Sequence, residues 1–316
     1  MRDEPASPTG ELIAYSCKEP RNAWYAICVM RSDGTEKQQL TSRLTTSDPA
    51  WSPDGRLVAF TRNEDVGEFT TFTDDDVFVM DADGDDPRPL TPEQDGSSSG
   101  QPTWSPDGRQ IAFVRGPSVA SAVTSATALR FGDLFVMRAD GSEATRLTRG
   151  GPDAAPAWSP DGGEIAFIRG YDLNLPSGGM DVYVVDSVGG APRPLTRTAG
   201  SEETAPAWSP DGSRIAFERS TPQTPYDGKA AIFVVDRDGT GERLVLEHRH
   251  FASGSYSLAW SPDGRTIAFE TSPAADCTAI ALVDVYSGAV RRLTTCTRSS
   301  PGALGPSWQP DADEGS

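Results

Sequence analysis

A five-residue motif, Trp-Ser-Pro-Asp-Gly, recurs along the chain and constrains its fold more than any other feature. Five complete copies are followed by a degenerate copy, Trp-Gln-Pro-Asp, near the C-terminus. The tryptophans that open these copies are Trp51, Trp104, Trp158, Trp208, Trp260 and Trp308. Repeats of roughly 50 residues are typical of β-propellers, in which each repeat forms one four-stranded blade. The spacing therefore predicts a propeller.

Each repeat has the pattern of four short strands. One strand ends at the Trp, Ser-Pro-Asp-Gly fits a type I turn, and an apolar run such as residues 57–60 follows. The repeated Asp is interpreted as a turn former rather than a ligand. After a connection of variable length, a third apolar run such as residues 77–80 leads through an Asp-rich turn into a strand that ends in Leu-Thr. We therefore expect an all-β fold with antiparallel blades.

The two ends of the chain predict how the ring closes. The first repeat lacks a Trp strand, whereas nothing follows the last Trp strand at Trp308. If residues 305–308 pair beside residues 11–16, the fragments form one blade and leave no exposed sheet edge at the junction. This gives six blades in one domain, residues 1–316. The expected blades are 304–310 plus 6–41, 48–91, 101–148, 155–196, 205–246 and 257–294.

The full pattern resembles a known repeat. Trp-Ser-Pro-Asp-Gly-x-x-Ile-Ala-Phe, then Val-Phe-Val-Met-Asp-x-Asp-Gly and Leu-Thr, is similar to the WD40-like (PD40) repeats of the TolB propeller, over essentially the whole chain. The resemblance implies a TolB-like six-bladed fold. It implies little about function, because one fold hosts many activities. Since the first blade is expected to begin near Ala6, we expect no N-terminal domain like that of TolB.

The net charge of the chain disfavours some classes of binding partner. There are 46 acidic and 28 basic residues, a formal net charge of −18. Binding to nucleic acids and to anionic membranes depends on Lys and Arg, so both are disfavoured. No apolar run approaches the roughly 20 residues that cross a bilayer. We expect a monomer with a protein or peptide partner.

Four cysteines form two candidate disulfides. Facing residues of a hairpin are equidistant from its turn: Cys17 and Cys28 are equidistant from residues 22–23, and Cys277 and Cys296 from residues 286–287. Each pair is therefore expected to face across neighbouring strands, about 5.5 Å apart at Cα as a disulfide needs. Disulfides favour an extracytoplasmic location: periplasmic, cell-surface or secreted. The alternative is four buried thiols in a cytoplasmic protein, which the lack of a signal-like N-terminus favours.

The loops of a propeller alternate between the two faces of its disc. The short, uniform Ser-Pro-Asp-Gly and Asp-rich turns share one face, here called the turn face. The connections from second to third strands and from blade to blade vary in length and share the other, here called the variable face. Varied loops on a rigid scaffold usually carry binding, so any site is expected there, at the mouth of the channel. Tyr171, Tyr226 and Tyr256 are candidate contacts in these loops.

Two polar segments of the variable face are candidate metal ligands. Asp74, Asp75 and Asp76 are expected in one long loop, as a calcium site or as a solvated acidic loop. His248 and His250 are expected on a blade-to-blade loop, where side chains two residues apart point the same way. A catalytic zinc site needs a third protein ligand, so exposed histidines without metal are the alternative. The metal state is left open, and no other cofactor is indicated.

Two function classes remain. The sequence assembles no nucleophile, acid/base pair or complete metal set, which favours a non-catalytic scaffold that binds a protein, peptide or glycan. The alternative is an enzyme of hydrolase or lyase type with a composite site at the channel mouth. Similar propellers occur in oligogalacturonate lyases, which use a histidine-rich metal site, and ahead of peptidase domains. The sequence does not identify the partner.

Overall fold

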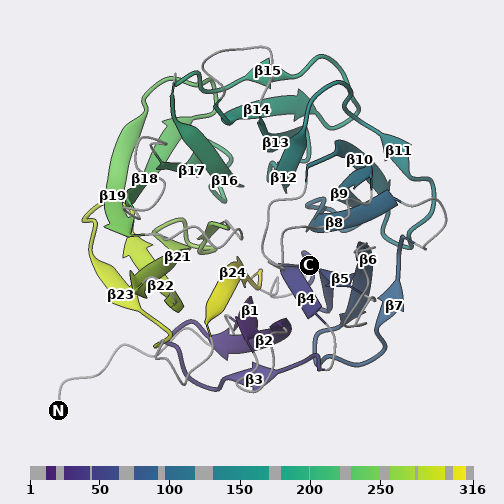
Figure 1. The fold of residues 1–316 in the computed structure, drawn as a ribbon, viewed down its shortest axis with the longest axis horizontal. Coiled ribbons are helices and arrows are strands. Elements are labelled where there is room, and N and C mark those ends of the chain that lie inside the picture. Colours follow the sequence, from purple (N-terminus) through teal and green to yellow (C-terminus); the bar gives the residue numbers. More distant parts are fainter. Residues whose placement is uncertain are drawn as a thin grey trace.

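The computed structural model of this 316-residue chain shows a ring of radially arranged β-sheets (Figure 1). The described residues are 12–18, 25–42, 45–63, 75–91, 97–117, 131–170, 179–198, 200–220, 229–249, 257–274, 277–295 and 302–310. Within them lie six four-stranded sheets, each an antiparallel blade. The predicted all-β, six-bladed propeller is confirmed.

Each blade is described from the axis to the rim. Blade 1 comprises β24 (Ala303–Trp308), β1 (Leu12–Lys18), β2 (Tyr25–Arg31) and β3 (Gln38–Gln39). Blade 2 comprises β4 (Thr45–Trp51), β5 (Leu57–Asn63), β6 (Asp75–Asp81) and β7 (Arg88–Pro89). Blade 3 comprises β8 (Ser97–Trp104), β9 (Gln110–Pro117), β10 (Asp133–Arg138) and β11 (Thr145–Arg146).

The second half of the ring has the same order. Blade 4 comprises β12 (Asp153–Trp158), β13 (Glu164–Arg169), β14 (Asp181–Asp186) and β15 (Arg193–Pro194). Blade 5 comprises β16 (Glu202–Trp208), β17 (Arg214–Ser220), β18 (Lys229–Asp236) and β19 (Arg243–Arg249). Blade 6 comprises β20 (Ala259–Trp260), β21 (Thr266–Ala274), β22 (Cys277–Asp284) and β23 (Val290–Arg292).

The ring closes where the sequence predicts. β24 pairs antiparallel with β1, with Ile13 opposite Trp308 and Ala14 opposite Ser307. The Gln309 N–H donates to the Leu12 carbonyl at 2.8 Å and so continues this ladder. Strands from both ends of the chain thus complete one blade, which removes a sheet edge that would otherwise be open.

The Ser-Pro-Asp-Gly segments form the predicted turns. In the first, Gly55 has a positive φ of 66° and donates its N–H to the Ser52 carbonyl at 2.9 Å. Ser52 Oγ donates to Asp54 Oδ1 at 2.6 Å and accepts from the Leu57 N–H at 2.9 Å. The Asp is therefore a turn former, as expected, because its carboxylate is bonded within its own turn.

The repeated Trp and Phe residues hold neighbouring blades together. Phe60, Phe113, Phe167, Phe217 and Phe269, on the second strands, are among the largest fully buried side chains. Trp104 donates its indole N–H to the Ala50 carbonyl of the preceding blade at 3.1 Å, and Trp308 donates to Ala259 at 3.0 Å. Each such bond joins two neighbouring blades close to the axis, so the repeated Trp also stabilises the ring.

Each inner strand except that of blade 6 contains a bulge that the sequence analysis did not foresee. Three residues before the Trp, and directly before a Pro, the backbone adopts a positive φ. The residues and angles are Asp48 (53°), Gln101 (55°), Ala155 (51°), Ala205 (55°) and Gly305 (61°). The Gln101 N–H donates a hydrogen bond to Thr61 Oγ1 of the preceding blade at 3.0 Å. This bond between blades stabilises the bulge at Gln101, where the backbone has an unfavourable φ.

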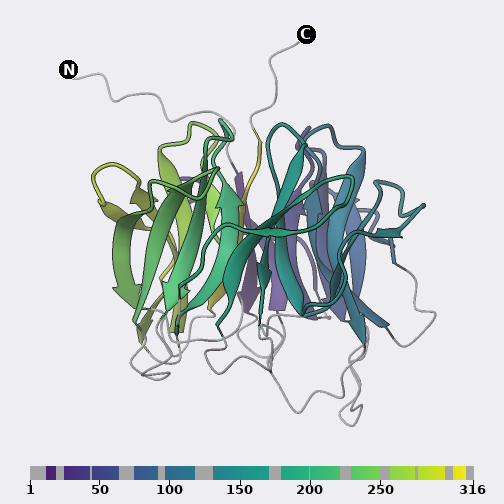
Figure 2. The ribbon, with the colours of Figure 1, turned by 90° about the horizontal axis from the view of Figure 1, so that it is seen from above.

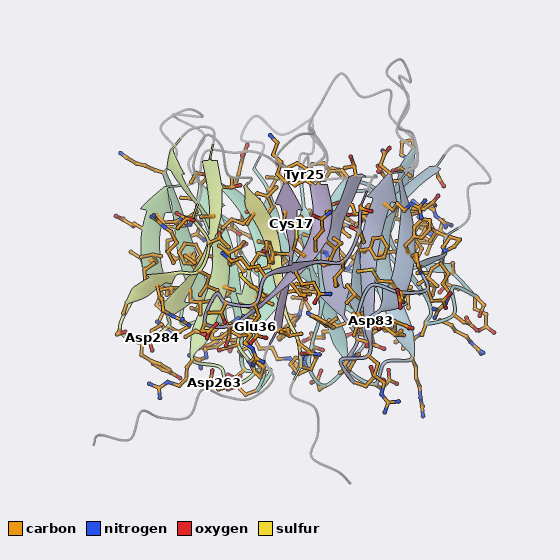
Figure 3. All side chains as sticks on the ribbon, turned by 90° about the horizontal axis from the view of Figure 1, so that it is seen from below. Cys17, Tyr25, Glu36, Asp83, Asp263 and Asp284 are labelled. Carbon is orange, nitrogen blue, oxygen red and sulfur yellow. A yellow bond between two sulfur atoms is a disulfide. The ribbon has the colours of Figure 1, made fainter. Side chains whose placement is uncertain are left out.

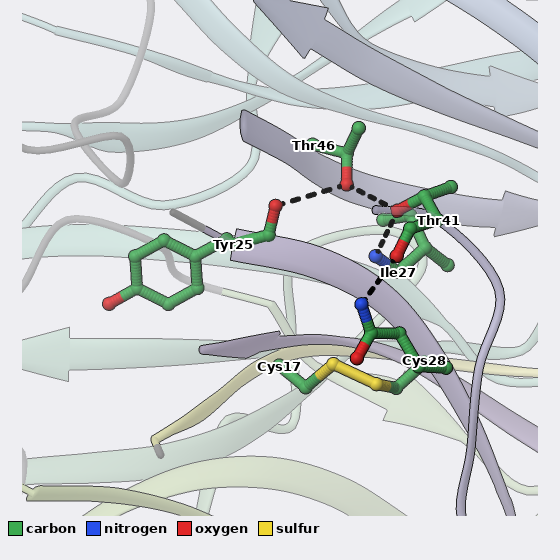
Figure 4. Close-up of a disulfide and its surroundings, with 7 residues drawn as sticks. Cys17, Tyr25, Ile27, Cys28, Thr41 and Thr46 are labelled. Carbon is green, nitrogen blue, oxygen red and sulfur yellow. Dashed lines mark hydrogen bonds between the residues drawn. A yellow bond between two sulfur atoms is a disulfide. The ribbon is translucent and has the colours of Figure 1, made fainter. Parts of the chain in front are cut away.

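Cys17 and Cys28 form a disulfide, as predicted, with Cα atoms 5.8 Å apart (Figure 4). The predicted register was wrong by two residues: Cys17 lies opposite Ala26, and Cys28 opposite Tyr15. The cysteines are diagonal neighbours, which the spacing of adjacent strands still allows to bond. The bridge stabilises the blade that closes the ring.

The second predicted bridge stays a prediction. β22 and β23 have the register that the prediction assumed for this hairpin, since Ala281 pairs with Arg292 and Val283 with Val290. Cys296 itself, and the side chain of Cys277, lie outside the described residues.

The two faces differ in their connections (Figure 2). On the turn face, every connection between the described strands has five or six residues: 52–56, 105–109, 159–163, 209–213, 261–265, 32–37, 82–87, 139–144, 187–192, 237–242 and 285–289. On the variable face, the connections from second to third strands range from two to fifteen residues: 275–276, 19–24, 221–228, 64–74, 170–180 and 118–132. Asp83, Asp263 and Asp284 mark the turn face in Figure 3, and Tyr25 the variable face.

Candidate binding face and the charged seams beneath it

Two of the three candidate aspartates lie on a strand and not in a loop. Asp75 and Asp76 open β6, where they are 1% and 5% exposed. Asp75 accepts hydrogen bonds from Asn63 Nδ2 at 3.0 Å and Ser98 Oγ at 3.3 Å, and Asp76 accepts one from Thr91 Oγ1 at 2.9 Å. The expected acidic loop is corrected here, because the strand extends further than its apolar residues indicate.

The predicted loop position of His248 is also wrong. It lies on β19, the seven-residue outer strand of blade 5, and not on a loop. Its side chain is 5% exposed, and Nε2 lies 3.1 Å from a carboxylate oxygen of Glu218. The imidazole meets Phe269 of blade 6 edge-on, with ring centroids 5.0 Å apart. The histidine therefore fills the interface between blades 5 and 6 and is not exposed on a loop.

The other candidate contacts lie outside the described residues. These are Asp74, His250, Tyr171, Tyr226 and Tyr256. Their role in binding stays a prediction. Among the residues that are described, no three His, Cys, Asp or Glu side chains come together as a metal site would require. The calcium expectation for residues 74–76 stays untested.

Beneath the variable face, charged side chains fasten blade 3 to blade 4. Asp153, at the start of β12, is fully buried. Arg169 donates to both of its oxygens, at 2.6 and 2.8 Å, and Thr148 of the Leu-Thr pair donates at 2.5 Å. Burial raises the pKa of Asp153, while the Arg169 and Thr148 hydrogen bonds act against that rise. We call this Thr–carboxylate–Arg arrangement a seam clasp.

A second seam clasp joins blades 4 and 5. Glu203 is fully buried and accepts from Thr196 Oγ1 of blade 4. Arg219 donates to Glu203 Oε1 at 2.9 and 2.7 Å and reaches Glu242 at 2.7 Å. Burial raises the pKa of Glu203, and the bonds from Thr196 and Arg219 oppose it. Asp153 and Glu203 are thus buried carboxylates with raised pKa values that link neighbouring blades. Each accepts hydrogen bonds from an Arg of its own blade and from a Thr of the preceding blade.

Sequence reasoning missed these clasps, although the repeat carries a signal for them. The carboxylates stand five residues before a Trp and the arginines two residues after the buried Phe. The corresponding residues in blades 2 to 5 are Thr46, Ser99, Asp153 and Glu203 on the inner strands, and Arg62, Arg115, Arg169 and Arg219 on the second strands. Aligning the repeats column by column would have revealed both positions.

On the turn face, by contrast, several carboxylates have lowered pKa values. Asp107 and Asp211 accept bonds from the serines of their own turns, and these bonds lower the pKa of each Asp. Asp161 has a lowered pKa chiefly because Arg237 binds it at 2.6 Å. A carboxylate whose folded pKa is depressed contributes stability above its unfolded pKa, and this contribution is lost as pH falls through the folded value.

Acid is therefore expected to remove the stabilisation by these turns. We expect the stability difference between wild type and the double variant Asp107→Asn/Asp211→Asn to be largest near pH 6 and to shrink below about pH 4, where unfolded aspartates protonate. Urea unfolding at pH 6, 4, 3 and 2 measures it. A difference that stays constant down to pH 2 would contradict the assigned pKa direction.

No protein-family model matches the chain. Two curated proteins match it over part of its length. An uncharacterized peptidase of Bacillus subtilis is 28% identical over 127 residues, 40% of this chain and 17% of the peptidase. An uncharacterized protein of Agrobacterium fabrum is 31% identical over 176 residues, 55% of this chain and 52% of that protein. The matched regions are thus about half of the second relative and much less of the first.

Solved structures match over nearly the whole chain. TolB from Acinetobacter baumannii has a TM-score of 0.72 at 19% identity, over 95% of this chain and 67% of that one. A putative TolB from Agrobacterium tumefaciens has a TM-score of 0.62 at 17% identity, over 95% and 99%. An oligogalacturonate lyase in complex with manganese has a TM-score of 0.58 at 14% identity, over 89% and 73%. The chain has a TolB-like six-bladed propeller fold.

These neighbours include TolB proteins and an enzyme, the oligogalacturonate lyase, so the fold alone does not decide between a binding protein and an enzyme. Within the described residues, no helix is long and apolar enough to cross a membrane.

Proposed function

We propose that the chain is a non-catalytic binding scaffold that recognises a protein, peptide or glycan through its variable face. One observation carries the proposal: the turn-face connections are uniform, at five or six residues, whereas those from second to third strands on the variable face range from two to fifteen. Loops free to diverge on a fixed frame are where recognition usually resides.

The seam clasps support this proposal. Asp153 and Glu203 are fully buried and bonded to residues of adjoining strands, so they fix the strand ends from which the variable connections begin. A rigid rim lowers the entropy lost when loops bind a partner. The same bonds occupy these carboxylates, so they are framework groups in this account.

We also propose an extracytoplasmic location. The disulfide between Cys17 and Cys28 supports it, because such bridges persist in oxidising compartments. The second bridge, between Cys277 and Cys296, belongs to the same proposal.

The test is affinity capture after chemical cross-linking in the native host, with envelope and cytosolic fractions kept apart. The variant Tyr171→Ala/Tyr226→Ala/Tyr256→Ala removes three aromatic candidates from the variable-face connections. The matched control, Val188→Ala/Tyr286→Ala, alters exposed turn-face residues that are 94% and 67% accessible. We expect one partner, enriched in the envelope, to be captured by wild type and control and lost with the variable-face variant.

Two results would count against the proposal. Loss of capture only in the turn-face control would place recognition on the other face. Turnover of a glycosidic or peptide substrate by the purified chain, abolished by variable-face changes, would establish the enzymatic alternative of hydrolase or lyase type.

A further inference from the structure

One position repeats in four consecutive blades and differs in its chemistry. Near the variable face, an Arg on the second strand lies directly opposite the residue five before the Trp. The register pairs are Arg62 with Thr46, Arg115 with Ser99, Arg169 with Asp153 and Arg219 with Glu203. In blades 4 and 5 the opposite residue supplies a carboxylate, whereas in blade 3 it supplies the hydroxyl of Ser99.

Arg115 is oriented as its counterparts are. Its guanidinium carbon lies 5.3 Å from the ring centroids of both Phe113 and Phe135. In blade 4, Arg169 lies 5.3 and 5.5 Å from the corresponding rings of Phe167 and Tyr183. The aromatic pair therefore holds both guanidinium groups in the same way, whether or not a carboxylate is present.

The polar contacts of the two arginines differ. Arg169 forms two hydrogen bonds with Asp153, one to each oxygen. Arg115 donates from Nε to Ser99 Oγ at 3.1 Å. A guanidinium has five N–H donors in a fork that matches a carboxylate, and a single hydroxyl can use only part of it. Arg115 is also half-buried, so part of its side chain is accessible to solvent.

Neighbouring carboxylates have other partners. Asp133, opposite Arg115 on β10, binds Arg146 at 2.5 Å. Asp75 of blade 2 accepts from Asn63 and Ser98. Within the described part of the chain, Arg115 forms no ion pair with an acidic residue, and residues 118–132, which join β9 to β10, contain no Asp or Glu in their sequence.

We propose that Arg115 is a carboxylate-binding site of the variable face. A ligand's carboxylate takes the place that Asp153 and Glu203 occupy in the next two blades, and binds the guanidinium through two N–H groups over the Phe113 and Phe135 rings. For its natural ligand, this inference rests on the proposed scaffold function: the carboxylate belongs to an acidic side chain or C-terminus of the partner. A small free carboxylate shares this chemistry.

Titration of the ¹⁵N-labelled full chain with sodium acetate tests the site, with sodium chloride at equal ionic strength as reference. The Arg115 Nε–Hε signal, assigned with Arg115→Lys, is expected to shift saturably with acetate. The signals of Arg169 and Arg219 serve as internal controls and should stay in place, because their carboxylates are already present. A blocked Ala-Glu-Ala peptide, with an Ala-Gln-Ala peptide as its control, distinguishes the two sources of the carboxylate. A stronger response to the Glu peptide than to acetate indicates a protein side chain as the ligand. Equal responses to the Glu peptide and to acetate indicate a free carboxylate.

The decisive variant is Ser99→Asp, which installs the carboxylate found in blade 4. It should weaken acetate binding at Arg115 about tenfold or more, since a bond to a charged group is worth about 1.5–3 kcal/mol. Ser99→Ala should retain the response. An Arg115 signal that moves no more in acetate than in chloride, or that responds equally in Ser99→Asp, would overturn the proposal. Neither result bears on partner capture, so the scaffold function is judged separately.

Discussion

Replacing Arg219 by Met is expected to lower the free energy of unfolding by about 3–5 kcal/mol, because it leaves a buried charge without its partner. Glu203 has no exposed side-chain surface and Arg219 only 12%. Without the guanidinium, the carboxylate would keep the Thr196 hydroxyl as its side-chain partner in the seam between blades 4 and 5. Denaturant unfolding followed by tryptophan fluorescence measures the loss.

Two further variants make this result specific to the seam. In Glu203→Gln/Arg219→Met the charge is gone from both sides, so most of the lost stability should return. Arg193→Met removes a guanidinium that is 45% exposed and paired with Glu164, and should cost less than about 1 kcal/mol. A single variant within 1 kcal/mol of wild type, or a double variant as unstable as the single one, would contradict the assigned role of the clasp.

Removing the Cys17–Cys28 bridge should be the other large effect. The cysteines are 11 residues apart, and freeing a loop of this length in the unfolded chain costs about 3 kcal/mol of stability. The bridge joins β1 and β2, and β1 also pairs with β24. Cys17→Ser/Cys28→Ser is therefore expected to unfold at lower denaturant concentration, with hydrogen exchange rising first in β1 and β24.

Peptide mapping of the native protein without reductant provides the control. It should recover Cys17 linked to Cys28, and Cys277 linked to Cys296 if the second predicted bridge forms. Wild-type protein treated with reductant should approach the stability of the double serine variant. Free thiols at Cys17 and Cys28 in protein isolated from its host would contradict both the bridge and the proposed compartment.

The features that could be predicted from sequence are those that repeat locally. The Trp spacing gives six blades, and the Ser-Pro-Asp-Gly turn is determined by its own side chains, as Ser52 and Asp54 show. Ring closure follows from two incomplete repeats whose strands, β24 and β1, complete each other. These inferences need no knowledge of contacts between blades.

The features that were missed depend on contacts between distant residues. Asp75 and His248 look like loop residues because they are polar and lie beside variable segments. Each is buried because another element supplies a partner, Ser98 for Asp75 and Glu218 for His248. In the second seam clasp, Glu203 and Arg219 face each other within blade 5, but Thr196 reaches Glu203 only after blades 4 and 5 pack.

The corrected positions also change how function should be tested. Replacing Asp75, Asp76 or His248 would disturb buried contacts, so lost binding in such variants would report misfolding as readily as recognition. Substitutions in the connections themselves, with exposed turn-face residues as controls, avoid that ambiguity.

The central claim is that partners bind the variable face. Site-resolved photo-cross-linking in the native host tests it most directly, with a photoreactive amino acid placed singly at Tyr171, Tyr226 or Tyr256 and at the exposed turn-face positions Val188 and Tyr286. We expect one recurring adduct from at least two of the three variable-face positions and none from the turn face. Adducts only from Val188 or Tyr286 would contradict it.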